Sequence, residues 1–338
     1  MTSTRRLRGL AASAVALATM FGTFCGVPAN AAPASPGSQI PLGETAAGGS
    51  TGARTCSAPP VSLGYYRMWR DVATTKAADR APNSQRMDDI PEEVDIVSMF
   101  ATSPADDPDM WAAARDSYIP KLHAQGTDVI FTLFVDKIAD ASIPLTEASY
   151  EAYAEQLLDT YVRPYGLDGL DIDLERNLTA DELTRASGVI RALSKSLGPK
   201  SGTGKYLILD TNDDGTHPLV RQAAPYIDYL LLQAYGRSAA SLESSWKTFA
   251  PYISSCQFLP GFSFYEERGA RWGDVNAPFD TSRAAAYARW QPQGGEKGGV
   301  FGYAVDRDGK EEGDDTITRS TFDWMKKLDG LIADVAIG

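Results

Sequence analysis

The sequence predicts a single-domain α/β protein in which eight parallel strands close into a barrel inside a ring of helices, the (β/α)8 or TIM-barrel architecture. Short apolar runs rich in Val, Ile, Leu, Phe and Tyr recur eight times after residue 60, as buried strands do. Helical patterns separate most of these runs, and eight strand–helix units in one domain favour a closed barrel over an open doubly wound sheet. The predicted strands are Leu63–Trp69, Asp95–Phe100, Asp128–Phe134, Gly169–Glu175, Tyr206–Thr211, Tyr229–Tyr235, Phe258–Phe264 and Val300–Val305.

Two of the intervening helices are marked by specific residues. Within residues 149–164, Tyr150, Leu157 and Tyr161 recur at helical spacing. The helix after the fourth strand begins at Thr179, which can cap it, and Glu182 is placed to complete a capping box. No GxGxxG or P-loop motif follows any predicted strand, which argues against a nucleotide-binding sheet.

The first 31 of the 338 residues have the features of an export signal. Arg5, Arg6 and Arg8 form a positive region, an apolar stretch of small and aliphatic residues follows, and Ala29-Asn30-Ala31 is an A-x-A cleavage site. We therefore predict a signal peptide over residues 1–31 and a secreted protein. The twin arginines also permit export by the twin-arginine route.

The segment after the predicted signal divides into a linker and a folded domain. Residues 32–57 are rich in Ala, Pro, Gly, Ser and Thr, a composition that cannot bury a core, so we predict a disordered linker. Residues 58–338 then form the barrel domain, because about 280 residues is a common length for one such barrel.

The formal net charge is −12, and removing the three signal arginines with no acidic residue gives −12 − 3 = −15. A strongly acidic chain without a basic cluster argues against nucleic acids and anionic membranes as partners. No later segment approaches the ~18 uninterrupted apolar residues that a membrane span requires. We therefore expect neither nucleic acid nor membrane among the partners.

Two cysteines, Cys56 and Cys256, remain after signal removal. They lie just before the first and seventh predicted strands, so both belong to the N-terminal face of the barrel, the face associated with stability. Only the eighth strand separates them in a closed barrel, and the loops can close that gap to the distance of a disulfide. We predict a Cys56–Cys256 bridge in an exported protein. Two cysteines and two histidines are too few, and too scattered, for a zinc site.

The fourth strand carries a run of carboxylates, Asp168-Gly-Leu-Asp171-Ile-Asp173-Leu-Glu175. Because side chains alternate across a strand, Asp171, Asp173 and Glu175 share one face, and the intervening Leu and Ile residues share the other. The apolar face suits the layer beneath the helices, so the three carboxylates should point into the barrel, with Glu175 nearest its C-terminal mouth. Like charges this close together raise one pKa and lower another, which is how an acid is kept protonated near neutral pH.

The same run resembles the DGxDxDxE signature of family 18 glycoside hydrolases, and it falls on the fourth of eight strands, as in that family. The resemblance implies a retaining, substrate-assisted mechanism that needs no metal or organic cofactor. It implies that Glu175 protonates the glycosidic oxygen and that Asp173 orients the 2-acetamido group of the substrate, which acts as the nucleophile. The resemblance also implies that Asp171 lies beneath Asp173 and tunes its charge. An inactive, sugar-binding barrel is a weaker alternative, because such relatives typically lack the terminal acid.

The sixth strand ends Leu232-Gln233-Ala234-Tyr235-Gly236, where chitinases of this family usually end M-x-Y-D. The Q-x-Y pattern is similar to that of the endo-β-N-acetylglucosaminidases, which cut between the two core N-acetylglucosamines of N-linked glycans. The resemblance implies that Tyr235 donates a hydrogen bond to the acetamido oxygen and that Gln233 holds the reacting sugar. N-linked glycans of glycoproteins are then the expected partners, and a chitinase or chitobiosidase acting on chito-oligosaccharides is the alternative.

Further substrate contacts are predicted at the strand ends. Asp210 and Asn212 close the fifth strand, and Asn212 is expected to touch a sugar. Aromatic rings can stack on the apolar faces of sugars, and Tyr66 and Tyr303 are the leading candidates for such platforms. The segment Asp306–Gly309 lacks the ligand spacing of a calcium loop, so we interpret it as a solvated turn. Other aromatic residues that could stack on sugars are Phe100, Phe134, Tyr265 and Trp272.

Overall fold

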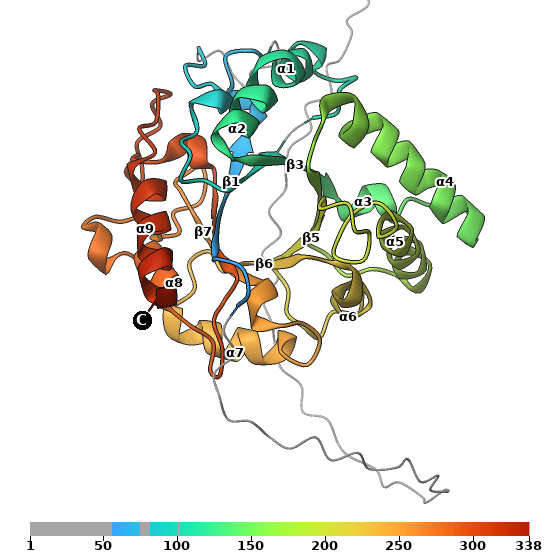
Figure 1. Ribbon diagram of the computed structural model, residues 1–338. Helices are drawn as coiled ribbons and strands as arrows, with labels where there is room; N and C mark the ends of the chain where they lie inside the picture. The colour runs from blue at the N-terminus through green and yellow to red at the C-terminus, as the bar shows by residue number, and fades with distance from the viewer. Residues whose placement is uncertain (1–55, 75–81, 101, 338) are drawn as a thin grey trace, which may run out of the picture. The chain divides into compact units, whose positions relative to one another are not determined.

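The computed structural model of the protein describes residues 56–74, 82–100 and 102–337. The predicted signal peptide and nearly all of the predicted linker lie outside the described residues. Eight strands, each parallel to its neighbours, form a closed barrel in the order β1 to β8, and helices surround it (Figure 1). The predicted fold class is therefore confirmed.

The strands differ from their predicted bounds by at most two residues at either end. They are β1 (Val61–Arg67), β2 (Ile96–Phe100), β3 (Asp128–Phe134), β4 (Gly169–Leu174), β5 (Tyr206–Thr211), β6 (Tyr229–Gln233), β7 (Phe258–Ser263) and β8 (Gly299–Tyr303). The α-helices are α1 (Pro108–Ala113), α2 (Ile119–Gln125), α3 (Val135–Ile138), α4 (Glu147–Leu157), α5 (Ala180–Leu193), α6 (Pro218–Ala223), α7 (Ala239–Phe249), α8 (Arg283–Arg289) and α9 (Asp323–Ile337). In the described part of the chain, none of these is long and apolar enough to cross a membrane.

Helix α5 shows how local sequence sets the element boundaries. The Thr179 side chain accepts a hydrogen bond from the backbone N–H of Glu182, and the Glu182 carboxylate accepts one from the backbone N–H of Thr179. This reciprocal pairing satisfies backbone donors that the first turn leaves open, so the predicted capping box is confirmed. Residues 175–178 alone separate the end of β4 from this cap, so the capped helix follows closely after the acidic strand.

Two hydrophobic layers lie on the two sides of the barrel wall. On β4, Leu170, Ile172 and Leu174 are at most 1% exposed and pack in the layer between strands and helices. A smaller cluster fills the lower barrel interior and contains one or two residues from most strands. Its buried members are Leu63, Tyr65, Ile96, Ile130, Ile208, Leu231, Leu259 and Phe301. This plug closes the barrel from below and leaves the C-terminal mouth as the place where polar side chains gather.

Three aspartates link the starts of neighbouring strands by hydrogen bonds: β1 to β2, β3 to β4, and β5 to β6. Asp95, Asp168 and Asp228 each immediately precede an even-numbered strand. In each case the carboxylate accepts a hydrogen bond from the backbone N–H of the second residue of the preceding strand, and the aspartate's own N–H donates to that residue's carbonyl. Asp168 therefore has a structural partner, consistent with its position on the opposite face from Asp171 and Asp173 in the acidic run.

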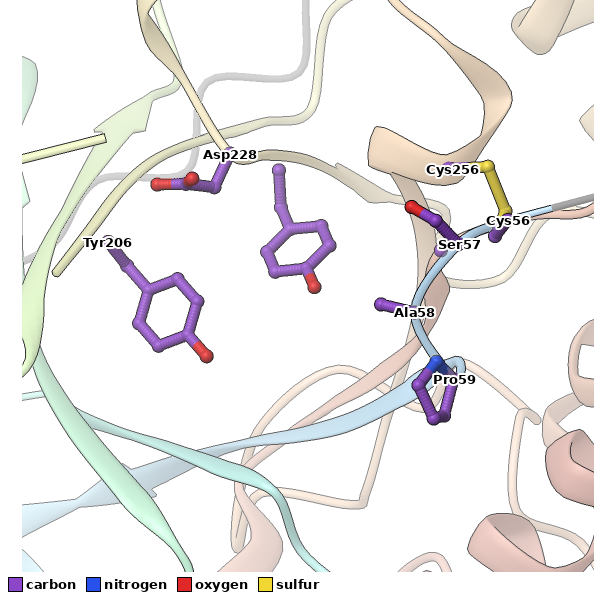
Figure 2. A pocket seen from close by; sticks show the side chains of 9 residues that line it. Cys56, Ser57, Ala58, Pro59, Tyr206, Asp228 and Cys256 are labelled. Atoms are coloured by element: carbon purple, nitrogen blue, oxygen red, sulfur yellow. A yellow bond between two sulfur atoms is a disulfide. The ribbon is translucent and has the colours of Figure 1, made fainter. Parts of the chain in front are cut away.

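The predicted disulfide between Cys56 and Cys256 is confirmed, with a Cα–Cα distance of 5.5 Å across 200 residues of sequence. It lies at the N-terminal end of the barrel beside a hollow of about 210 Å³ (Figure 2). Tyr206, Asp228 and Tyr229 line the other side of that hollow. The disulfide thus fastens the segment that leads into β1 to the segment that leads into β7.

Replacing both Cys56 and Cys256 by serine should lower the free energy of unfolding by roughly 2–4 kcal/mol, because the bridge restricts a long loop in the unfolded chain. The measurement is thermal unfolding followed by circular dichroism, where Tm should fall by several degrees. The wild-type protein in excess reductant should unfold at the temperature of the double variant. An unchanged Tm would show that the bridge contributes nothing to stability.

Candidate active site

The three carboxylates of β4 project into the barrel at increasing height. Asp171 is fully buried, Asp173 is 3% exposed, and Glu175, one residue beyond the strand, is exposed at the mouth. The prediction that they share the interior face is confirmed. The site therefore offers an ordered column of acids that runs from a dry interior to solvent.

Asp171 is held by hydroxyl groups from β1 and β3. Its Oδ2 accepts hydrogen bonds from the Tyr65 hydroxyl at 2.8 Å and from the Thr132 hydroxyl at 3.0 Å. Ser98 extends the network, with its Oγ 2.5 Å from Thr132 Oγ1. Burial raises the pKa of Asp171 to about 6, although the two hydroxyl donors favour its charged form.

Compared with Asp171, Asp173 has weaker hydrogen-bond donors, and the negative charges of its neighbours affect it more strongly. Burial raises the pKa of Asp173 to about 8, and the negative charges of Glu175 and Asp171 add to that rise. The amide of Gln233, at the end of β6, lies 3.4 Å from Asp173 Oδ1 and 2.8 Å from Glu175 Oε1. Gln233 thus lies against both acids, and its predicted contact with the reacting sugar is compatible with this position.

Tyr235, two residues beyond the end of β6, packs among aromatic rings at the site. Its ring lies 6.2 Å from Phe301, 6.1 Å from Tyr303 and 6.0 Å from Trp272, measured between ring centroids. Burial and the nearby carboxylates, Asp210 first, raise the pKa of the Tyr235 hydroxyl well above its usual value. Tyr235 therefore stays a neutral hydrogen-bond donor over the working pH range.

A crescent of aromatic rings borders the mouth from β1 to β3. Phe100 lies 5.8 Å from Trp69, 5.6 Å from Phe134 and 5.8 Å from Tyr303, again between ring centroids. Phe134 is 48% exposed, and Trp272 on the β7 side is 42% exposed. Partly exposed rings that border a group of carboxylates are suited to stacking on sugar faces. Asn212 is exposed at the end of β5, a position compatible with its predicted sugar contact.

The predictions for Tyr66 and Tyr265 as sugar platforms are wrong. Tyr66 is fully buried in the layer beneath the helices, where its hydroxyl donates to Asp71 at 2.8 Å. Tyr65, not Tyr66, faces the barrel interior, because Leu63 on β1 lies in the inner cluster and the faces alternate along the strand. Tyr265 is 4% exposed and bonds to Asp315.

The solvated turn predicted at residues 306–309 is also wrong, because Asp306, Arg307 and Asp308 are at most 4% exposed. Asp306 accepts from the fully buried guanidinium of Arg67 at 2.6 Å. Asp308 accepts from two backbone N–H groups at the start of α9. The segment after β8 is therefore a buried anchor.

Arg67, at the end of β1, forms ion pairs with carboxylates, and no pattern in the sequence indicated these pairs. It pairs with Glu266 at 3.0 Å and Glu267 at 2.9 Å, in addition to Asp306. Glu266 keeps 37% of its side chain exposed and has its other oxygen 3.5 Å from the Tyr303 hydroxyl. Arg67 therefore holds the accessible carboxylate of Glu266 beside Tyr303, and Tyr303 is one of the predicted sugar contacts.

The described residues contain no group of three or more His, Cys, Asp or Glu side chains placed to hold a metal ion. The chemistry that this chain's own residues can supply is proton transfer and charge stabilisation. The acids at the mouth, the Tyr235 hydroxyl and the Gln233 amide are the groups available for it.

Replacing Tyr65 by Phe removes one of the two hydroxyl donors to Asp171 and should raise the pKa of that acid further. Because Asp171 is then more often neutral, its negative charge no longer helps to stabilise positive charge that develops on the reacting sugar, and we expect kcat to fall about tenfold. The ring contacts with Phe100 and Phe301 persist, so Tm should change little. Tyr66→Phe is the matched control one residue along the strand. It loses a bond on the opposite face and should lower Tm while leaving kcat unchanged; equal kinetic effects in both variants would contradict this assignment.

A closed β/α barrel with a column of acids at the end of its fourth strand defines a glycoside hydrolase. The family described as the endo-beta-N-acetylglucosaminidase EndoS TIM-barrel domain matches residues 64–302. The chain is 42% identical over 274 residues to endo-beta-N-acetylglucosaminidase F2 of Elizabethkingia meningoseptica, covering 79% of this chain and 80% of that protein. This chain belongs to the endo-β-N-acetylglucosaminidase family.

Other similarities agree with this assignment. The chain is 35% identical to endo-beta-N-acetylglucosaminidase EndoS of Streptococcus pyogenes serotype M1, over 73% of this chain but only 29% of that longer protein. The crystal structure of an endo-beta-N-acetylglucosaminidase from Cordyceps militaris superposes with a TM-score of 0.77 at 44% identity, over 82% of this chain and 92% of that one. A chitinase from Bacteroides thetaiotaomicron, 15% identical with a TM-score of 0.54 over 83% of this chain and 97% of its own, shares the fold.

Proposed function

We propose that this enzyme hydrolyses the β-1,4 bond between the two core N-acetylglucosamines of N-linked glycans by the substrate-assisted mechanism of family 18 glycoside hydrolases. The observation that carries the proposal is the column Asp171, Asp173 and Glu175, with Gln233 at the end of β6 against it and Tyr235 two residues further on. The Cordyceps militaris relative supports the substrate, because a doubly substituted form of it is described in complex with fucosyl-N-acetylglucosamine-Asn. In that form an Asp is replaced by Asn and, two positions later, a Glu by Gln, which is the spacing of Asp173 and Glu175.

In the first step, Glu175 in its acid form donates its proton to the glycosidic oxygen as the bond from that oxygen to C1 breaks. The carbonyl oxygen of the 2-acetamido group attacks C1 from the other face and closes a cationic oxazolinium ring. Asp173 as a carboxylate accepts the acetamido N–H and stabilises the positive charge that develops on the ring. The Tyr235 hydroxyl donates to the acetamido oxygen and orients it toward C1.

In the second step, Glu175 acts in the reverse sense. Its carboxylate takes a proton from a water molecule while the water oxygen attacks C1 and reopens the ring. Two displacements at C1 retain the anomeric configuration, and Glu175 returns to its acid form. The position of Glu175 at the exposed end of the column suits this alternation, because water and the leaving sugar both reach it directly.

The test is incubation of the purified protein with a glycoprotein and, separately, with chitin oligomers, each read by mass spectrometry. The expected product is a protein that keeps one N-acetylglucosamine on each modified asparagine, together with a free glycan that ends in the other. Cleavage of chitin oligomers with an untouched glycoprotein would favour the chitinase alternative. Loss of the whole glycan from asparagine would refute the proposed bond.

We further propose that the protein is exported and processed after Ala31. The basic residues, apolar stretch and A-x-A site at the start of the chain support this, and so does a disulfide, which forms in oxidising compartments. N-terminal sequencing of the protein recovered from the culture medium should begin at Ala32. Retention of the full-length chain inside the cell would contradict export.

A further inference from the structure

A fourth carboxyl group, that of Asp210 on β5, lies within the acid column but outside the DGxDxDxE run. Asp210 is the register partner of Asp173 on β4 and is 2% exposed. Its Oδ2 accepts a hydrogen bond from Gln233 Nε2 at 2.9 Å. Its Oδ1 is buried and has no hydrogen-bond partner among the residues that the structure describes.

The carboxyl oxygens around Gln233 outnumber the N–H groups that can donate hydrogen bonds to them. The Gln233 amide nitrogen carries two hydrogens, yet it faces three carboxyl oxygens, of Glu175 at 2.8 Å, Asp210 at 2.9 Å and Asp173 at 3.4 Å. Two N–H groups can serve at most two of them. Within the described part of the chain, no Lys, Arg or His forms an ion pair with any of these acids or with Asp171. The cluster must therefore hold protons of its own.

Among the four acids, Asp210 has the least support for a negative charge. Asp171 is equally buried and also has one oxygen without a donor, but its other oxygen accepts from the hydroxyl groups of both Tyr65 and Thr132. Asp173 and Glu175 lie nearer the solvent at the mouth. Asp210 has one amide donor and one oxygen without any donor, and a buried, unserved carboxylate is far more costly than a buried acid.

The side chains that face Asp210 from the neighbouring strands do not favour its charged form either. The titratable groups that face Asp210 are Asp171, Asp173 and Glu175 from β4, Tyr235 from beyond β6, and Tyr65 from β1. All of them are acidic or neutral. Burial, and then the charges of Asp173 and Asp171, raise the pKa of Asp210 well above its usual value, which agrees with the donor count.

We propose that Asp210 is a positioning residue that remains protonated at neutral pH and whose carbonyl oxygen fixes the Gln233 amide between Asp173 and Glu175. This inference rests on the proposed function. With one Gln233 N–H engaged by Asp210, the second points to Glu175 and supports its carboxylate after it has given up its proton. A neutral Asp210 also spares Asp173 a further negative neighbour, so Asp173 can ionise when the acetamido N–H is presented to it.

The experiment compares Asp210→Asn with Asp210→Leu. Asparagine has the shape of a protonated aspartic acid and keeps the carbonyl acceptor, so kcat at neutral pH should stay within about threefold of wild type. Leucine removes the acceptor and frees the amide, and kcat should fall on the order of 10²-fold. Asp228→Asn, at the opposite end of the barrel, is the control: it changes a half-buried carboxylate that bonds to a strand backbone far from the mouth, and it should leave the kinetics unchanged.

Two further measurements separate this role from a merely structural one. The wild-type kcat should decline at alkaline pH as Asp210 loses its proton, and in Asp210→Asn that decline should move to higher pH because the ionising group is gone. The infrared difference spectrum between wild type and Asp210→Asn at neutral pH should show the loss of one protonated carboxyl band. This second measurement needs no substrate, so it is informative even if wild type releases no glycan, the result that would refute the proposed function instead.

The proposal is overturned if Asp210→Asn is as impaired as Asp210→Leu and the spectra show loss of a carboxylate band. That result would mean that Asp210 works in its ionised form. The proposal is also refuted if the Asp210→Asn enzyme is active and its kcat declines at the same alkaline pH as that of wild type.

Discussion

Glu175→Gln should lower kcat by at least about 10³-fold, because an amide can neither donate a proton to the glycosidic oxygen nor take one from water, and both steps depend on this residue. The fold should be unaffected. Glu175 is exposed, and its contact with Gln233 Nε2 can be kept by the carbonyl oxygen of the new side chain. The measurement is release of glycan from a glycoprotein under single-turnover conditions, alongside Tm.

A separate binding measurement distinguishes loss of chemistry from loss of substrate. Calorimetry with a glycopeptide should give Glu175→Gln a Kd close to that of an uncleaved substrate analogue on wild type. Glu151→Gln, exposed on the outer helix α4 and paired with Lys195, is the matched control and should retain full activity. Turnover above about a tenth of wild type in Glu175→Gln would remove this residue from the role of acid and base.

Strand parity explains why the sequence identified the acids but misplaced Tyr66. On β4, polar and apolar residues alternate without exception, so the pattern itself distinguishes the two faces. On β1, Tyr65 and Tyr66 are both aromatic, and both faces of that strand are buried. The pattern there is symmetric, and only closure of the barrel decides which tyrosine reaches Asp171.

The features that the sequence did not predict depend on partners far apart in the chain. Arg67 meets Glu266 and Asp306 across 199 and 239 residues, and no local pattern marks those pairs. The segment at 306–309 is polar and rich in turn-forming residues, a composition typical of solvated turns. Nothing in that local pattern indicates the distant groups that bury it. The disulfide was predictable because strand order alone placed Cys56 and Cys256 one strand apart at the same end of the barrel.

Asp173→Asn should lower kcat by roughly 10²–10³-fold, because the amide cannot stabilise the positive charge of the oxazolinium ring as a carboxylate does. The defect should be specific to ring closure. A synthetic sugar oxazoline already contains the closed ring, so its hydrolysis should be impaired much less than glycan release. If both substrates lost activity equally, Asp173 would act in a step other than substrate assistance.

The same substitution should stabilise the folded protein at alkaline pH. Burial and the charges of Glu175 and Asp171 raise the pKa of Asp173 to about 8, so the folded state binds this proton more tightly than the unfolded state does. Stability is therefore lost as pH rises from the unfolded value near 4 through about 8. Asparagine does not ionise and avoids this loss, which this rise in pKa limits to at most about 5 kcal/mol.

The measurement is Tm of wild type and Asp173→Asn at pH 5 and at pH 9. At pH 5 only about a quarter of this loss has occurred, so the two proteins should unfold at similar temperatures. At pH 9 the variant should unfold several degrees higher. An equal difference at both pH values would point to altered packing instead of a removed charge. A variant that is more stable and nearly inactive would show that the enzyme keeps a destabilising buried carboxylate because the reaction requires its charge.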